Sequence, residues 1–194
     1  AFKEKQSNFV ADFPERGELE LLGIDRQLDI AILGKMFSGT SHISIPVFDF
    51  PLGNAKDLEW GSFVYLLGYP KGYLMVTKGI VSQPNRDDHT SFLVDALFNK
   101  GFSGGIVLAI KDGVPNFEMV GMAGSVSADF EYSLVPPEDI SRFGYDPRVP
   151  YSGDIFLKQN RNINYGITFI VSAESIQSFI KTHLQEFLDR GYDL

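Results

Sequence analysis

Short apolar segments separated by turn residues dominate this sequence. Nineteen glycines and ten prolines punctuate segments rich in Val, Ile, Leu, Phe and Tyr, a pattern typical of many β-strands joined by turns. At 194 residues the chain is long enough for one compact domain, or for two small subdomains that share a cleft. We therefore expect an all-β core. The predicted strands cover residues 7–13, 18–23, 29–33, 63–68, 79–82, 91–95, 106–110, 117–124 and 166–171.

The last part of the sequence follows a different period. Between residues 172 and 190, apolar side chains recur at the spacing of one helix face. Ser172 and Ser175 both suit the N-cap position, and Gly191 suits the residue that ends the helix. The members of the predicted packed face are Ile176, Phe179, Ile180, His183, Leu184 and Leu188. We expect a C-terminal helix that packs against the β structure.

Two stretches interrupt the strand pattern. Residues 50–54 bring Pro, Gly and Asn together, which predicts a boundary between two subdomains. Residues 125–165 are rich in Ser, Asp, Pro and Asn, with isolated aromatic residues. This composition predicts a long loop that gates a cleft, mediates oligomer contacts or is simply mobile.

Charge and composition exclude several classes of function. Seventeen basic and 25 acidic residues give a net charge of −8, with no basic run to follow a phosphate backbone, so nucleic acid is not an expected partner. No stretch approaches the roughly 20 apolar residues of a membrane span. The sequence has no cysteine, which excludes thiolate catalysis, disulfides and the common Cys-containing zinc sites.

The strongest chemical signal is the glycine-dense segment of residues 99–105, between two predicted strands. Ser103 stands at its centre, followed by two glycines. An acyl-transfer nucleophile needs an exposed hydroxyl on a tight turn whose N–H groups converge on the developing oxyanion. Gly101 allows the backbone conformation and the close approach that such a turn needs. The alternative is an ordinary hairpin turn of small residues.

Residues 95–105 read Asp-Ala-Leu-Phe-Asn-Lys-Gly-Phe-Ser-Gly-Gly. They resemble the nucleophile segment of the HtrA/Deg branch of chymotrypsin-type serine proteases, in which Asp-Ala precedes Asn-Pro-Gly-Asn-Ser-Gly-Gly. Lys100 and Phe102 replace the usual Pro and Asn. The resemblance implies that Ser103 is the catalytic nucleophile and that the N–H groups of Gly101 and Ser103 form the oxyanion hole.

Residues 23–33 resemble the strand of this family that carries the catalytic aspartate, which implies that role for Asp29. The apolar neighbours Leu28 and Ile30 predict a partly buried carboxylate, suited to orienting an imidazole. The alternative is an aspartate that merely begins a strand. A purely structural β domain gives no reason for Asp29 and the Ser103 loop to converge.

Further matches follow in family order, over residues 52–70, 76–82 and 166–171. The resemblance implies a trypsin-like fold of two six-stranded antiparallel barrels with a C-terminal helix. Residues 1–52 then form a partial first barrel, because they provide too few strands to close one. Residues 53–194 form the second barrel, with residues 125–165 as an insertion.

The family's histidine precedes its aspartate in a Thr-Asn-x-His-Val-like segment, and residues 1–28 contain none. His42, His89 and His183 do not match by motif. His42 suits a surface position better than a rearranged triad, and His89 with two neighbouring aspartates is a weak metal site. His183 is expected to pack from the C-terminal helix against the barrel. We expect the catalytic histidine outside residues 1–194, and the alternative is a pseudoprotease.

The resemblance also indicates which residues bind substrate. Leu97, Phe98, Ala123, Gly124 and Ser125 line the primary pocket and its adjacent strand edge. All are apolar or small, and no aspartate stands six residues before the nucleophile, so we expect cleavage after small or medium apolar residues. Phe98 is expected to narrow the pocket.

The expected activity is that of a serine endopeptidase acting on unfolded or extended chains. An extended peptide is predicted to add as a strand along residues 122–125. The alternative is a catalytically inactive, chaperone-like module that binds peptides. No metal or organic cofactor is expected. The resemblance implies a homo-oligomer and a location in the cell envelope or periplasm.

Overall fold

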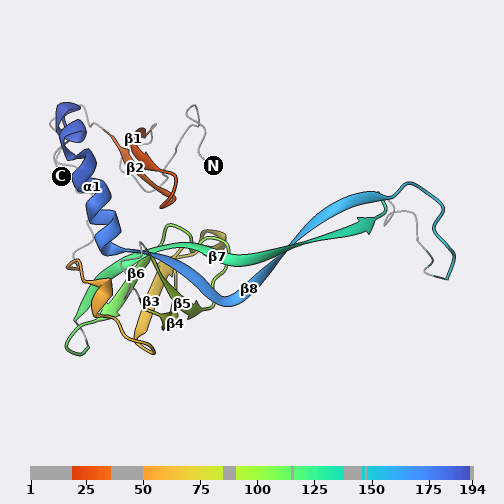
Figure 1. The fold of residues 1–194 in the computed structure, drawn as a ribbon, viewed down its shortest axis with the longest axis horizontal. Helices are drawn as coiled ribbons and strands as arrows, with labels where there is room; N and C mark the ends of the chain where they lie inside the picture. The colour runs from red at the N-terminus through yellow and green to blue at the C-terminus, as the bar shows by residue number, and fades with distance from the viewer. Residues whose placement is uncertain are drawn as a thin grey trace.

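The computed structural model of the chain describes residues 19–35, 50–84, 91–114, 116–137, 146 and 148–192. The predicted strand at 7–13, His42 and His89 lie outside these residues. The described part contains two β-sheets and a C-terminal α-helix, with two short 3₁₀ turns. This confirms the mainly β class (Figure 1).

Six strands close into an antiparallel barrel in the order β3-β4-β5-β8-β7-β6. Alternate side chains point inward, so that Val64, Leu66, Val94 and Val107 are fully buried in its core. Two strands match the sequence prediction over their whole length, β3 and β6. The bounds are β3 Phe63–Gly68, β4 Met75–Gln83, β5 Ser91–Ala96, β6 Ile106–Ile110, β7 Phe117–Val135 and β8 Phe156–Ser172.

The first sheet of the described residues has two antiparallel strands, β1 (Glu20–Asp25) and β2 (Ile30–Gly34). The Asp25 carboxylate accepts hydrogen bonds from the N–H groups of Gln27 and Leu28, at 2.8 and 3.0 Å, and so holds the turn between the strands. This hairpin lies in the range for which the sequence predicts a partial first barrel.

The helix α1 (Ala173–Asp189) begins and ends where the sequence predicts. The Ser172 hydroxyl accepts from the N–H of Ser175 at its N-terminus, and Gly191 has a positive φ of 83° after its last turn. Phe179 packs with Ile30 and Val171 in a second small core, which joins the helix, the hairpin and the barrel. No helix of the described residues is long and apolar enough to cross a membrane.

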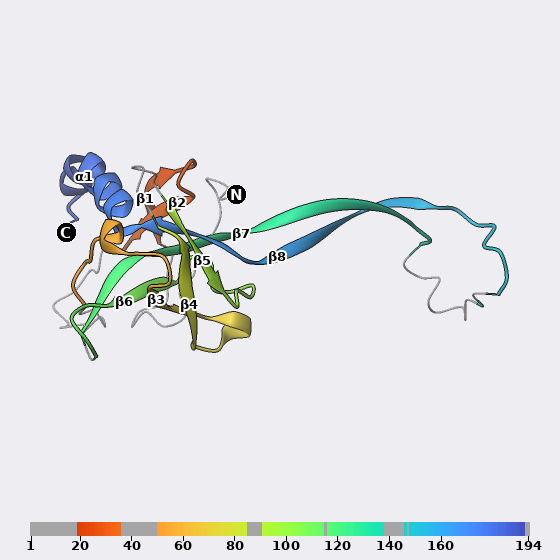
Figure 2. The ribbon, with the colours of Figure 1, turned by 60° about the horizontal axis from the view of Figure 1, so that its bottom comes forward.

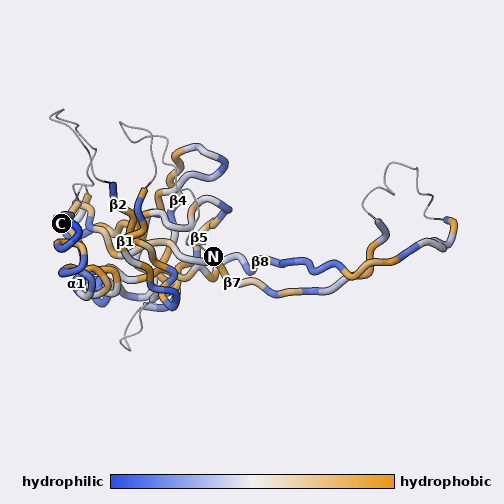
Figure 3. The backbone as a smooth tube through the Cα atoms, turned by 90° about the horizontal axis from the view of Figure 1, so that it is seen from above, coloured by the Kyte–Doolittle hydropathy of each residue, from blue (hydrophilic) through white to orange (hydrophobic). Residues whose placement is uncertain are grey.

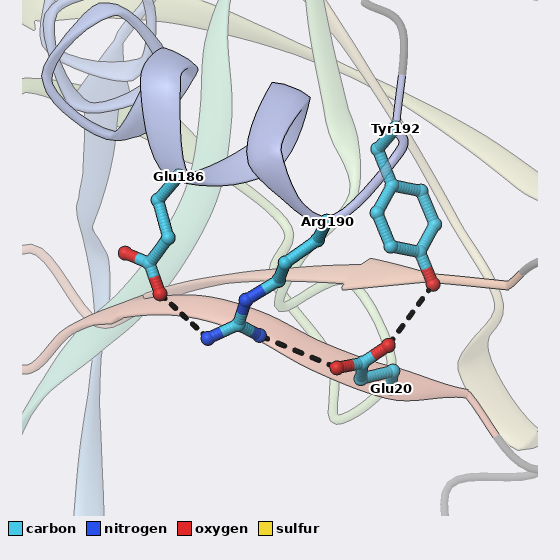
Figure 4. A network of polar contacts seen from close by, with 4 residues as sticks. All are labelled: Glu20, Glu186, Arg190 and Tyr192. Carbon is cyan, nitrogen blue, oxygen red and sulfur yellow. Dashed lines mark hydrogen bonds and ion pairs between the residues drawn. The ribbon is translucent and has the colours of Figure 1, made fainter.

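Polar contacts tie the end of α1 to the first sheet (Figure 4). The Arg190 guanidinium bridges Glu186, at 2.6 Å, and Glu20, at 3.3 Å. The Tyr192 hydroxyl donates to the same Glu20 carboxylate at 3.2 Å. The hairpin is therefore fastened to the helix by apolar packing at one end and by this network at the other.

Residues 50–54, the predicted subdomain boundary, are hydrogen-bonded to β7 of the barrel. The N–H of Gly53 donates to the carbonyl of Met119, and the N–H of Met119 donates to the carbonyl of Pro51, both at 2.8 Å. The turn η1 (Ala55–Asp57) follows, capped by the Asn54 side chain. A second turn, η2 (Pro70–Gly72), joins β3 to β4.

The prediction of a loop over residues 125–165 is wrong at both ends. β7 and β8 continue past the barrel as a two-stranded antiparallel ribbon, paired from Ala128 opposite Ile163 to Val135 opposite Phe156. We call residues 128–135 and 156–163 the arm. Figures 1 and 2 show it projecting far from the barrel. Pairing between the two strands supplies the hydrogen bonds that a loop of this composition lacks.

Candidate active site

The segment around Ser103 consists of two consecutive tight turns. The N–H of Phe102 donates to the carbonyl of Asn99 at 3.1 Å, and the N–H of Gly105 donates to the carbonyl of Phe102 at 2.9 Å. The third residue of each turn is a glycine with positive φ, Gly101 at 113° and Gly104 at 80°. Turns with positive φ at the third position favour glycine, which explains the glycine spacing.

Close packing against the β3–β4 connection holds the first turn. The N–H of Tyr69 donates to the carbonyl of Gly101 at 2.9 Å. A side chain on Gly101 would place its Cβ 2.6 Å from the Tyr69 carbonyl oxygen and 2.7 Å from the Pro70 Cα. Gly101 is therefore fixed both by its conformation and by its neighbours.

Below the turns, two aromatic rings anchor the segment in the barrel. Phe102 and Phe98 are buried in the main core, with ring centroids 5.9 Å apart. Phe102 replaces the polar residue usual in the resembling segment, and its burial explains why an apolar side chain suits this position. Phe98 was expected to narrow a substrate pocket, and the structure places its ring in the barrel core instead.

The turns leave the chemically important groups of Ser103 accessible. Ser103 is exposed. Within the described ranges, no hydrogen-bond acceptor is found for the N–H groups of Gly101 and Ser103. Two unengaged N–H donors next to an exposed hydroxyl are the arrangement that stabilises an oxyanion formed by attack of that hydroxyl.

Two backbone hydrogen bonds from β7 hold the second turn in place. The N–H of Gly104 donates to the Ala123 carbonyl at 2.7 Å, and the N–H of Ala123 donates to the Gly105 carbonyl at 2.8 Å. Ala123 is fully buried, Gly124 is half-buried and Ser125 is exposed. The predicted substrate edge therefore begins directly beside the nucleophile turn.

Asp29 lies on the other side of that edge. It lines a recess of about 190 Å³ between the hairpin and the barrel, together with Leu28, Gly124 and Ser125. Ser103 and Asp29 thus both adjoin the short segment 123–125 of β7, one through Ala123 and one through Gly124 and Ser125.

The local environment of Asp29 differs from the expectation of partial burial. Asp29 is exposed and has a positive φ of 55°, because it is the last residue of the β1–β2 turn. Aspartate is among the few residues besides glycine that adopt this conformation readily. Ile30, the next residue, is the one that is buried.

His183 is the histidine that the structure describes, and it does not join this group. Its Nδ1 lies 2.9 Å from the Phe179 carbonyl, and its ring packs between Phe179 and Phe187 at centroid distances of 4.6 and 6.0 Å. It lines a separate recess that contains Asp25 rather than Asp29. His183 therefore has a structural role, but its ring packs against aromatic residues of its own helix rather than against the barrel as predicted.

Leu97 completes the predicted substrate-binding set. It is 71% exposed, just before the nucleophile turns. The described residues contain no cluster of three or more acidic or histidine side chains placed to hold a metal ion.

Sequence reasoning missed the role of the β3–β4 connection, which supports Gly101 through Tyr69 and Pro70. The signal was present in the Gly68-Tyr69-Pro70 sequence, but only the tertiary fold brings that connection against residue 101.

Comparison with known proteins assigns the chain to a family. Residues 4–122, more than half of the chain, match the family described as trypsin-like peptidase domain. The chain belongs to this family. No curated protein sequence matches it significantly.

The structure of this trypsin-like peptidase domain resembles a solved structure described as "HtrA-type protease AlgW with decapeptide". The TM-score is 0.54 at 16% sequence identity, over 88% of this chain and 42% of that one. The chain therefore spans less than half the length of that protein. The likeness is one of fold, and it confirms the predicted trypsin-like architecture.

Proposed function

We propose that this trypsin-like peptidase domain carries the nucleophile of a serine endopeptidase. The observation that supports this most is the pair of glycine turns at residues 99–105, which expose Ser103 beside two unengaged N–H groups. The Ser103 oxygen attacks the peptide carbonyl, and the N–H groups of Gly101 and Ser103 stabilise the resulting oxyanion.

In this proposal Asp29 orients the histidine that takes the proton of Ser103 and later returns it to the leaving amine. That histidine comes from outside residues 1–194, since His183 is engaged on the helix and neither His42 nor His89 has the family motif. The recess that Asp29 lines together with Gly124 and Ser125 supports this role.

The proposed substrates are extended polypeptides cleaved after a small or medium apolar residue. Leu97, the exposed apolar residue before the turns, and the small residues Gly124 and Ser125 support this preference. Main-chain pairing with the edge of β7 supplies affinity with little demand on sequence.

A fluorophosphonate probe tests the proposal, because it reacts with a serine activated by a nearby base. The full-length protein is labelled and digested, and the modified residue is located by mass spectrometry. We expect an adduct on Ser103 that is lost in Ser103→Ala and kept in Ser178→Ala, a change of an exposed serine on α1.

An unlabelled Ser103 in the full-length protein, with a control protease labelled in parallel, overturns the endopeptidase proposal. It favours the peptide-binding module without catalysis, which retains the β7 edge but lacks an activating base.

A further inference from the structure

β7 leaves the barrel with one edge free. It pairs with β6 from Phe117 to Met122 and with β8 from Gly121 onward, so that both of its edges are paired at Gly121 and Met122. From Ser125 to Val135, its partner among the described strands is β8 alone. A free edge exposes backbone N–H and C=O groups that pair with another extended chain unless they are covered.

The register of the arm separates its side chains into two different faces. Directly opposed residues share a face, so Phe130, Tyr132 and Leu134 lie on one face with their β8 partners, which are Arg161, Gln159 and Leu157. The β7 half of this face is apolar, whereas the β8 half carries two polar side chains. Their side chains are 58%, 64% and 71% exposed. Figure 3 shows hydrophobic stretches gathered toward the distal part of the arm.

The opposite face of the arm is polar. Asp129, Glu131 and Ser133 share it with three β8 partners, which are Asn162, Asn160 and Lys158. Side-chain hydrogen bonds span this face, from Asn160 to Ser133 at 2.8 Å and from Asn164 to Asp129 at 3.1 Å. The apolar face has little of its own surface to pack against, and a two-stranded ribbon alone is marginally stable in water.

We infer that the free β7 edge from Ser125 to Val135, which we call the rail, binds a long extended polypeptide as a third, antiparallel strand. The rail begins two residues after Ala123, which is bonded to the nucleophile turn. An antiparallel chain with its scissile bond at Ser103 then runs its N-terminal side out along the arm. The position of the scissile bond rests on the proposed peptidase function, whereas binding to the rail does not.

The arm also defines the chemistry of this polypeptide. Every second side chain of the added strand neighbours Phe130, Tyr132 or Leu134, which favours apolar residues there. The intervening side chains neighbour Asp129 and Glu131, which favours Lys or Arg. The rail is roughly 35 Å long at about 3.3 Å per residue, so it accommodates about ten residues. The occupant is an unfolded segment with alternating apolar and basic residues.

A second copy of the arm fits the same edge less well. In the register centred on Phe130, two antiparallel rails place Asp129 of one copy opposite Glu131 of the other, whereas the register centred on Tyr132 places Glu131 opposite Ser133. Directly opposed like charges destabilise a strand pair, and each chain carries a net charge of −8. An unfolded basic segment meets neither obstacle.

Peptide binding to the full-length Ser103→Ala protein tests the rail without relying on chemistry. The probe is a fluorescein-labelled peptide with an apolar residue for the pocket, preceded by ten alternating Val and Lys residues, and its Kd is measured by anisotropy. We expect at least tenfold weaker binding for a Val/Glu peptide and for one in which two Lys are replaced by Pro, which cannot donate backbone hydrogen bonds.

Variants of the protein locate the binding. We expect Tyr132→Ser combined with Leu134→Ser to weaken binding of the Val/Lys peptide at least fivefold. The matched control is Val114→Ser, which changes a 74% exposed apolar residue in the β6–β7 turn and is expected to leave Kd within twofold. Circular dichroism confirms that each variant is folded. An unchanged Kd in the folded arm variant overturns the rail.

Cleavage by the unmodified protein tests the direction. Lengthening a substrate on the N-terminal side of the scissile bond raises kcat/KM, whereas equal lengthening on the C-terminal side does not, and the reverse result overturns the antiparallel rail. If the probe does not label Ser103 but peptide binding still depends on the arm, the peptidase proposal is wrong and the rail proposal stands. If the arm variant dissociates an oligomer in sedimentation while peptide binding is unchanged, the arm is a contact between copies and the rail is wrong.

Discussion

The carbonyl oxygen of Ala123 accepts a 2.7 Å hydrogen bond from the N–H of Gly104, the residue that follows Ser103. The same strand lines the recess of Asp29 two residues further on and then continues into the arm. β7 therefore adjoins the nucleophile turn, the recess that Asp29 lines and the proposed substrate strand. The first sheet and the Ser103 turn are thus related through β7, without a direct contact being needed between them.

Gly101 and Gly104 form a matched pair of test sites. Both have positive φ, but a Cβ at 101 clashes with Tyr69 and Pro70, whereas a Cβ at 104 meets nothing within 4 Å. We expect Gly104→Ala to cost about 1 kcal/mol of unfolding free energy through backbone strain alone. Gly101→Ala is expected to cost more, about 2–4 kcal/mol, and to abolish labelling of Ser103. Urea unfolding and probe labelling measure both effects, and equal losses in the two variants contradict the packing argument.

Asp29 has a local role in the turn and a proposed role in catalysis, and Asp29→Asn separates them. Asparagine tolerates the same positive φ, so we expect the unfolding midpoint to stay within about 1 °C. A neutral amide holds an imidazole in the wrong tautomer, which lowers the rate by about 10⁴ in the serine protease for which it is known. We therefore expect a drop of several orders of magnitude in the labelling rate of Ser103.

The control for Asp29 is Gln27→Ala, which changes another residue of the same recess. In this variant we expect the probe to label Ser103 at the same rate as in the unmodified protein. Labelling of Asp29→Asn at the unmodified rate would show that Asp29 serves only the turn.

Tyr192 gives the stability a specific alkaline dependence. Burial, followed by the hydrogen bond to Glu20 and the charge of Glu20, raises the pKa of its hydroxyl. The folded protein therefore keeps this proton to a higher pH than the unfolded chain. The resulting stability is fully present below the unfolded pKa of about 10 and is lost as pH rises through the folded pKa.

Tyr192→Phe removes that titration. Denaturant unfolding measures the unfolding free energy at pH 9 and at pH 11. We expect Tyr192→Phe to lose less stability between these two pH values than the unmodified protein does. The difference between the two losses is the contribution of residue 192. A steeper alkaline loss in the variant contradicts the direction of the shift.

Thr168 offers a stabilising substitution. Its side chain is fully buried in β8, and its hydroxyl has no hydrogen-bond partner among the described residues. Thr168→Val replaces the hydroxyl by a methyl group of similar size, and we expect a gain of about 1 kcal/mol in unfolding free energy. Thr182→Val is the control, because that hydroxyl is exposed and donates to the Ser178 carbonyl. A gain in the control and none at 168 contradicts the prediction.

The barrel strands and the helix were predictable because their signals are local. β3 and β6 alternate or concentrate apolar residues between turn residues, and Ser172 and Gly191 mark the two ends of α1. The nucleophile turn was predictable for the same reason, since glycine spacing encodes positive φ within the segment itself.

The arm and the exposure of Asp29 were not predictable in this way. The β8 part of the arm reads Phe-Leu-Lys-Gln-Asn-Arg-Asn-Ile, which by composition resembles a polar loop, and only pairing with β7 makes it a strand. The Asp29 side chain is flanked by apolar residues, but the αL conformation at the end of the turn places it outside the core. Phe98 is buried in the barrel core beside Phe102, a tertiary contact that the local sequence pattern does not encode.

The late position of β8 in the chain has a consequence for folding. β5 must wait for β8 before it is paired on both sides, and Ser91 meets Val171 across 80 residues of sequence. Such non-local pairing is slow to form. A growing chain that has not yet reached residue 156 therefore carries open edges at both β5 and β7, the kind of surface on which nascent strands aggregate. Synthesis of β8 covers the open edge of β5 through residues 168–171, and it covers one of the two edges of β7 along the arm.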